Sequence, residues 1–291
     1  MKTKWMIATA GLLIAVSCDF LSDTLLDKPQ DGAISSAVMW KDANDVMTST
    51  TGIYYRLMTC FDQDEMNVFY WGEARVGEYM WGPGLDAKAT DANKRAVLLS
   101  NMTGATTSCG WSALYSTIDQ ANLVLKYAPT VEMTDGDRDY CLGQAFFARA
   151  YCYFWAARLW GDVPLNLVPI ESTTQEETYP VRTPAAEVYD QIGRDIESAL
   201  GYAGRLGSNC YFATAPAVHM LDAEYSLWMY AVRGGGDSFL DRADDALKAL
   251  SLSRNRLSDN YADIFDRNAK KGKEVVFALK HDQGEKQTGG Y

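Results

Sequence analysis

Apolar residues at helical spacing fill most of the chain after residue 110, and this pattern limits the fold more than any other feature. The clearest run lies between residues 142 and 157, where large rings and alanines repeat at intervals of three and four. Its members are Leu142, Ala145, Phe146, Arg149, Ala150, Tyr153, Phe154 and Ala157. Such spacing predicts a helix with a buried face, and alanines placed between rings allow a second helix to approach closely.

Weaker runs of the same kind predict further helices, and start and stop signals separate them. The runs cover residues 46–57, 114–125, 188–199, 218–229 and 243–250. The capping residues that we expect are Asp42, Asp135 or Asp137, Thr183 followed by Pro184, Thr214 and Asp237. Gly161 suits the end of the 142–157 helix, and Pro164 prevents its continuation. Short links between these helices predict antiparallel pairs arranged in a repeat-like stack.

Two segments depart from this helical pattern. Residues 60–108 are rich in Gly, Asp, Asn and Thr with scattered aromatic residues, so we expect them to be mostly loop. Residues 274–280 read EVVFALK and are the one convincing strand-like run, because they are rich in β-branched and aromatic residues. We expect the segment from Asn260 to Phe265 to form a single helical turn. The expected fold class is therefore mainly α, with long loops and at most a small β element near residue 280.

The first 17 residues have the form of a secretory signal peptide. Lys2 and Lys4 precede an apolar run of roughly ten residues, which is too short to span a bilayer. The sequence Ala15-Val16-Ser17-Cys18 then resembles a bacterial lipobox, in which the cysteine becomes the lipidated first residue of the mature protein. Two or more acyl chains give stable anchoring. The alternative is an ordinary signal peptide with an incidental cysteine. Residues 18–35 are polar and turn-prone, as expected for a tether.

Composition excludes several classes of function. The formal net charge is −11 without a basic cluster, which argues against nucleic acid and against anionic lipid headgroups as partners. The cysteines after Cys18 show no metal-binding spacing. His219 and His281 lie far apart in the sequence, so we expect no metal site and no histidine-dependent nucleophile. We expect no cofactor, and contact with the membrane only through the lipid anchor.

Several motifs in order resemble the SusD/RagB-like nutrient-binding lipoproteins of the Gram-negative outer membrane. The mature start CDFLSDTLLDKPQDG resembles the opening of that family, and MWKDANDVMTSTTGIYYRL resembles its first helix. WSALYSTIDQANLVL is similar to a helix of that family that begins with Trp and carries the pattern Ile-x-x-Ala-Asn, which is formed here by Ile118, Ala121 and Asn122. AFFARAYCYFWAARLWGDVPL is the most specific piece, and YFATAPAVHMLDAEYSLWM and EVVFALK follow in the family order.

The resemblance implies a fold, a function and a partner. It covers about residues 18–280 and corresponds to the N-terminal half of the family, so we expect residues 36–291 to form a SusD-like N-terminal helical domain without the C-terminal half. The family scaffold is a tetratricopeptide-like stack of helix pairs. Its members are lipid-anchored at the outer membrane, facing the cell exterior. They bind glycans or peptides, do not cleave them, and deliver them to a TonB-dependent (SusC-like) transporter.

The sequence WGEARVGEYMWGPGLDAKATDANKR is the best local candidate for an oligosaccharide site. Aromatic rings stack on the flat faces of sugars, while carboxylates and amides bind hydroxyl groups. We therefore expect Trp81 and Tyr79 to form a stacking platform and Asp86 and Asn93 to bind hydroxyl groups. The alternative is that the tryptophans only pin this loop to the helices, and this reading is favoured for Trp71.

Other conspicuous residues are expected to be structural. Trp111, Trp155, Trp160 and Trp228 belong to helix faces and are expected in the core. Arg149 and Asn122 should form ion pairs or hydrogen bonds between helices. The pairs Glu176-Glu177 and Asp244-Asp245 are expected to be solvated, because adjacent helical positions point apart and make poor acid/base dyads.

Three functions remain open from sequence. The first is a glycan-binding lipoprotein that serves a transporter. The second is a helical protein-interaction scaffold without its own glycan site, or a non-functional truncated family member. The third is a glycan-degrading enzyme, which would need two carboxylates about 5–10 Å apart across a cleft. No carboxylate pair in the sequence is marked for that role, and we do not expect an enzyme.

Overall fold

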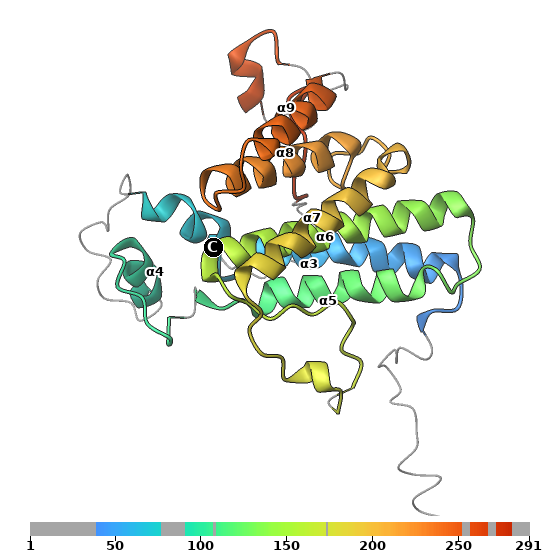
Figure 1. Ribbon diagram of the computed structural model, residues 1–291, viewed down its shortest axis with the longest axis horizontal. Coiled ribbons are helices and arrows are strands. Elements are labelled where there is room, and N and C mark those ends of the chain that lie inside the picture. Colours follow the sequence, from blue (N-terminus) through green and yellow to red (C-terminus); the bar gives the residue numbers. More distant parts are fainter. Residues whose placement is uncertain are drawn as a thin grey trace, which may run out of the picture. The chain divides into compact units, whose positions relative to one another are not determined.

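The computed structural model describes residues 39–76, 91–106, 109–172, 174–251, 257–266 and 272–280. The chain divides into a unit at residues 1–41 and a second unit at residues 42–291. The described helices all begin in the second unit, and Figure 1 shows them coloured along the sequence. Among the described residues no helix is long and apolar enough to cross a membrane.

The second unit is built from α-helices joined by loops and short 3-10 turns. The helices are α3 (Ala43–Trp71), α4 (Asp91–Leu98), α5 (Ser112–Tyr127), α6 (Asp135–Trp160), α7 (Ala185–Gly201), α8 (Ala215–Ala231) and α9 (Ser238–Ser251). The 3-10 turns are η2 (Glu73–Arg75), η4 (Glu176–Thr178), η5 (Ala203–Arg205) and η6 (Tyr261–Phe265). Helix α5 packs against α3 and α6, α6 packs against α7, and α8 packs against α9. The mainly helical fold class and the pairing of sequential helices are confirmed.

Helix α6 forms the centre of this stack. It packs against α3, α5, α7 and α8, so its buried residues are spread over several faces. The alanines predicted to allow close approach are buried, as are Tyr153 and Phe154. Gly143 serves the same purpose where α6 meets η5. A Cβ atom at this position would lie 2.7 Å from Leu206 Cδ2 and 2.8 Å from Tyr202 Cβ, closer than packed atoms approach.

Two of the predicted helix starts are confirmed. The Asp42 side chain accepts hydrogen bonds from the backbone nitrogens of Asn44 and Asp45 at 2.9 and 3.1 Å. Thr214 caps α8 by accepting from Ala217 N at 3.3 Å. Both arrangements satisfy amide groups that the first turn of a helix leaves without partners.

Two other predicted helix starts are wrong. Thr134, and not Asp135 or Asp137, caps α6; its hydroxyl accepts from Asp137 N at 3.1 Å and donates to Asp137 Oδ2 at 2.7 Å. A hydroxyl at the cap position can donate and accept at the same time. The two aspartates lie in the first turn, where their negative charges interact favourably with the positive end of the helix dipole. Helix α7 begins at Ala185, after Pro184 and not at it. The capping group for α7 comes from Asp162, far away in sequence.

The predicted loop at residues 60–108 is also corrected. Helix α3 continues to Trp71, and residues 91–98 form α4. Phe61 contacts Tyr151 and Trp155 of α6, and Trp71 contacts Trp160, with ring centroids 5.4–5.8 Å apart. Tertiary packing of this kind sustains a helix through polar residues that would favour a loop in isolation.

The predicted strand at residues 274–280 is absent from the structure, since the described residues include only one isolated bridge, between Val163 and Thr183. Phe277 instead packs against rings of Tyr54, Phe147 and Tyr151, and Ala278 N donates to Cys210 O at 2.9 Å. Phe277 therefore packs against helical residues, and the described part of the chain contains no strand with which this segment could form a ladder. The helical turn expected near residue 261 is confirmed as η6.

Candidate functional site

Four tryptophans converge where α3 and α6 end and α5 begins. We call Trp71, Trp111, Trp155 and Trp160 the aromatic end. The ring centroids of Trp71 and Trp160 are 5.6 Å apart, those of Trp111 and Trp160 are 5.8 Å apart, and those of Trp71 and Trp155 are 6.2 Å apart. Such contacts between rings stabilise more than buried area alone. The aromatic end is thus a rigid platform made by three separate elements.

The predicted oligosaccharide site follows this platform directly. Tyr79, Trp81 and Asp86 lie outside the described residues, as does Cys18. Asn93 lies on α4 with its side chain partly exposed. The described flanks are η2, which follows Trp71 after a single residue, and α4, which packs against both η2 and α3. The described residues on either side of positions 77–90 therefore belong to η2 and α4, which contact each other.

The structural role expected for the tryptophans is confirmed in part. Trp71 is buried, which agrees with packing as its main role. Trp111, Trp155, Trp160 and Trp228 are only half-buried. The indole nitrogens of Trp160 and Trp228 donate to Cys109 O at 3.1 Å and to the Tyr189 hydroxyl at 2.9 Å. Each of these two rings is thus held in a fixed orientation while part of it remains open to solvent.

The motif Gly161-Asp162-Val163-Pro164 closes the long loop that runs from α6 to α7. Gly161 has a φ of +70°, a conformation that favours glycine, and ends α6. Asp162 Oδ1 accepts from Ala185 N at 2.8 Å and so caps α7. Thr183 N donates to Val163 O at 2.9 Å, and the Tyr115 hydroxyl donates to Pro164 O at 2.5 Å. Asp162, Val163 and Pro164 thus each connect the end of α6 to another segment of the chain.

The same closure holds Arg182 over the aromatic end. Arg182 Nη1 donates to Asp162 O at 2.5 Å, and its guanidinium carbon lies 4.6 Å from the centroid of the Trp111 ring. A cation over an indole face is attracted by the ring quadrupole. Sequence reasoning missed Asp162 as the α7 cap and Arg182 as the partner of Trp111. The GDVP motif was visible in the sequence, but its partners lie about twenty residues later.

We expect Asp162→Ala to lower the free energy of unfolding by about 1 kcal/mol, as the loss of a helix cap does. The physical reason is that Ala185 N loses its acceptor at the start of α7. Urea denaturation of Asp162→Ala and Asp162→Asn measures this, and the asparagine variant should retain most of the stability because its amide oxygen can still accept. Equal losses in the two variants would show that capping is not the role of Asp162.

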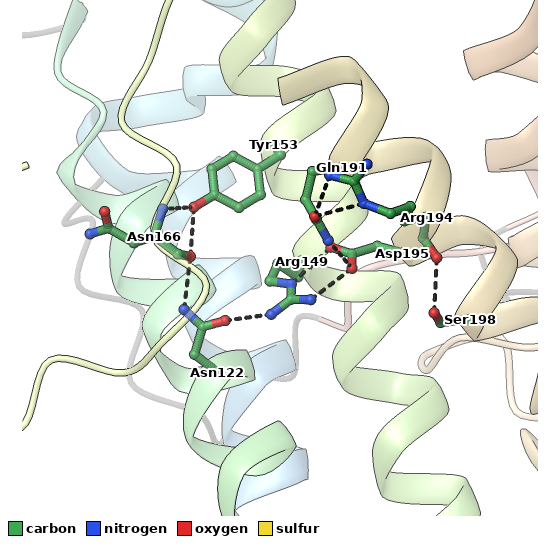
Figure 2. Close-up of polar contacts among 8 residues, drawn as sticks. All are labelled: Asn122, Arg149, Tyr153, Asn166, Gln191, Arg194, Asp195 and Ser198. Carbon is green, nitrogen blue, oxygen red and sulfur yellow. Dashed lines mark hydrogen bonds and ion pairs between the residues drawn. The ribbon is translucent and has the colours of Figure 1, made fainter. Parts of the chain in front are cut away.

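A buried polar network anchors the middle of the same loop (Figure 2). Arg149 Nε and Nη2 donate to the two oxygens of Asp195 at 2.8 and 2.7 Å, which joins α6 to α7. Arg149 Nη1 donates to Asn122 Oδ1 at 2.9 Å, and Asn122 Nδ2 donates to Asn166 O at 3.0 Å. A charge buried at this depth needs a partner with good geometry. The structural roles expected for Arg149 and Asn122 are confirmed.

Tyr153 completes this network on the loop side. Its hydroxyl donates to Asn166 O at 2.8 Å and accepts from Asn166 N at 2.7 Å. Burial raises the pKa of Tyr153, so the hydroxyl remains a donor at neutral pH. Farther along the loop, Asp119 accepts from Ile170 N at 2.8 Å, and burial raises the pKa of this carboxyl although the hydrogen bond opposes the shift. These groups hold backbone and are not available to a ligand.

Other charged side chains of the described residues lie at the surface or pair with one another. Asp244 and Asp245 are exposed, as expected, and Lys248 pairs with Asp244. Within the described ranges no three His, Cys, Asp or Glu side chains gather where a metal ion could bind. Cys141 and Cys152 are buried, and burial raises the pKa of both thiols.

Comparisons with known proteins agree on one group. A family model described as "Starch-binding associating with outer membrane" matches residues 85–202. The SusD-like protein P38 of Formosa agariphila is 28% identical over 200 residues, which are 68% of this chain and 37% of that protein. A SusD-like protein of Bacteroides ovatus is 25% identical over 290 residues, which are 96% of this chain and 50% of that protein.

The structure has solved counterparts as well. The structure of B. fragilis NanU superposes with a TM-score of 0.74 at 26% sequence identity, over 88% of this chain and 51% of that chain. This chain therefore spans about half, or less, of the length of the proteins that it resembles.

Proposed function

This chain belongs to the SusD/RagB-like family, and on that premise we propose that it is a carbohydrate-binding protein of the outer membrane. It is anchored through Cys18, faces the cell exterior and captures oligosaccharide. It binds the sugar without cleaving it and delivers it to a TonB-dependent, SusC-like transporter.

The observation that carries this proposal is the aromatic end. Four tryptophans of α3, α6 and the start of α5 pack on one another, and Tyr79 and Trp81 follow Trp71 closely in the sequence. Binding groups on a loop that is held by a rigid scaffold are the usual arrangement in ligand sites. The mixture of rings with Asp86 and Asn93 suits sugars, which present both apolar faces and hydroxyl groups.

We expect Trp81→Ala to weaken oligosaccharide binding at least tenfold, because the bound sugar loses the indole ring that would supply its main apolar contact. Isothermal titration of the full chain with glucose oligosaccharides of α- and β-linkage measures the affinity. Tyr179→Ala is the matched control, since that aromatic residue is 82% exposed on the 161–184 loop. Unchanged affinity of Trp81→Ala with an intact thermal transition would reject the stacking role.

The anchor gives an independent prediction. Cells that express the chain should incorporate a clickable palmitate analogue into it. Cys18→Ala should abolish this label and the recovery of the protein in the membrane fraction. Retention of the label in Cys18→Ala, or no label in the wild type, would contradict lipidation at this residue.

A protein-interaction scaffold remains the second candidate. The half-buried rings of the aromatic end and the closed 161–184 loop could then serve packing alone. Co-purification of a SusC-like transporter without measurable sugar affinity would favour this reading over the first.

A further inference from the structure

Arg182 is an exposed cation held in a fixed position at the rim of the aromatic end. Its guanidinium carbon lies 4.6 Å from the centroid of the Trp111 ring, and its Nη1 donates to Asp162 O at 2.5 Å. The residue as a whole is exposed, whereas Trp111 beneath it is half-buried. The ring and the carbonyl therefore fix the guanidinium on one side and leave its other side open to solvent.

The positive charge of Arg182 is not neutralised within the described part of the chain. The arginines there that form ion pairs with carboxylates are Arg138, Arg149, Arg158, Arg205 and Arg242. The carboxyl of Asp162 is occupied elsewhere, since its Oδ1 accepts from Ala185 N at 2.8 Å. An indole face attracts a cation without removing its charge. A guanidinium has five N–H groups, so most donors of Arg182 remain for another acceptor.

The charge of Arg182 acts on the aromatic residues next to it. The Tyr115 ring contacts Trp111 with centroids 5.9 Å apart. Burial raises the pKa of Tyr115, and the positive charge of Arg182 opposes this rise. Arg182, Trp111 and Tyr115 thus belong to one surface, on which a cation borders aromatic rings.

This cation contrasts with the charge of the whole chain. The formal net charge is −11, but residues 73–95, which contain the predicted oligosaccharide site, hold four acidic and four basic side chains. Salt screens exposed charges over about 10 Å at 0.1 M ionic strength. An acidic ligand at the aromatic end would therefore interact mainly with charges close by, and Arg182 supplies a positive one.

We propose that Arg182 is a specificity-determining residue that selects oligosaccharides bearing carboxylates over neutral ones of the same linkage. This inference rests on the proposed sugar binding at the aromatic end and adds the substrate class. The planar guanidinium matches a carboxylate through two parallel hydrogen bonds. Aromatic rings bind the apolar faces of sugar units, while the fixed cation at their rim binds the acidic group.

Isothermal titration of the full chain with matched pairs of oligosaccharides tests the proposal. The probes are glucose oligosaccharides of α- and β-linkage and the same oligosaccharides after oxidation of their C6 alcohols to carboxylates. The members of a pair share linkage and length and differ in charge. We expect the oxidised member of the better-bound pair to bind about fivefold more tightly at low ionic strength, as one exposed bidentate ion pair allows. This preference should shrink at high ionic strength, because salt screens the pair.

Three variants assign the preference to Arg182. Arg182→Gln should abolish it, and Arg182→Lys should keep part of it, because lysine retains the charge without the planar fork. Arg205→Gln is the matched control. It also removes one exposed arginine, but Arg205 lies beside Asp139 in the first turns of α6, whereas the aromatic end lies at the last turns. Arg205→Gln should therefore keep the full preference.

The outcomes separate this inference from the proposed function. Equal affinity of the two members of each pair in the wild type would overturn the inference and leave sugar binding intact. A preference that persists in Arg182→Gln, or that is lost equally in Arg205→Gln, would overturn it in the same way. Absence of binding by every probe would contradict sugar binding itself, and the inference with it. The salt dependence of the wild type tests the role of charge without any substitution.

Discussion

We expect Arg149→Ala to lower the free energy of unfolding by about 3–5 kcal/mol, as the breaking of a buried ion pair does. The substitution leaves Asp195 charged and buried, with Gln191 Nε2 at 2.9 Å as its remaining side-chain donor. It also removes the donor to Asn122, which holds the backbone at Asn166 and Val168. Equilibrium unfolding in urea measures the loss.

Two further variants separate this cause from a general effect of losing an arginine. Arg205→Ala removes an exposed arginine 3.7 Å from Asp139, and should cost less than about 1 kcal/mol. Arg149→Met combined with Asp195→Leu should recover part of the loss, because neither charge then remains buried alone. A loss in Arg149→Ala no larger than that in Arg205→Ala would contradict the structural role of this network.

The second large effect is expected at the centre of α6. Phe154→Ala should lower the free energy of unfolding by about 3–5 kcal/mol, because a buried ring leaves a cavity. Phe154 is fully buried, and its ring contacts Tyr225 and Trp228 of α8 while Arg158 lies over its face at 4.1 Å. The substitution therefore weakens the junction of α6 with α8 as well as the core.

Phe146→Ala is the matched control on the same helix. Phe146 is only half-buried and stacks on Tyr202 with centroids 6.3 Å apart, so its loss should cost less than about 2 kcal/mol. Urea midpoints of the two variants give the comparison. Equal midpoints would contradict the burial of Phe154 at the junction of α6 with α8.

Much of this architecture could be predicted because it depends on local patterns. The 142–157 run, Asp42, Thr214 and Gly161 each act within a few residues, and each was placed correctly. The end of α3 could not be predicted in this way, since Phe61 and Trp71 are held by rings of α6 about ninety residues later in the chain. The EVVFALK segment has strand composition, but a strand also needs a partner edge, and its neighbours are helices.

In the candidate site, too, only the roles that depend on local sequence patterns could be predicted. The structural roles of Arg149 and Asn122 followed from polar residues on apolar helix faces. The positions of Arg182 over Trp111 and of Asp162 at α7 depend on loop closure across about twenty residues, which no local pattern reveals. Tyr79, Trp81 and Asp86 remain predictions from sequence, and Asn93 is placed on α4 without a tested role.

Hydrogen exchange of the full chain with and without a bound glucose oligosaccharide tests the central claim most directly. The account predicts that protection on binding is concentrated in peptides that cover residues 77–98 and 109–113, next to the aromatic end. Protection confined to α8 and α9, or no change anywhere at saturating oligosaccharide, would contradict it.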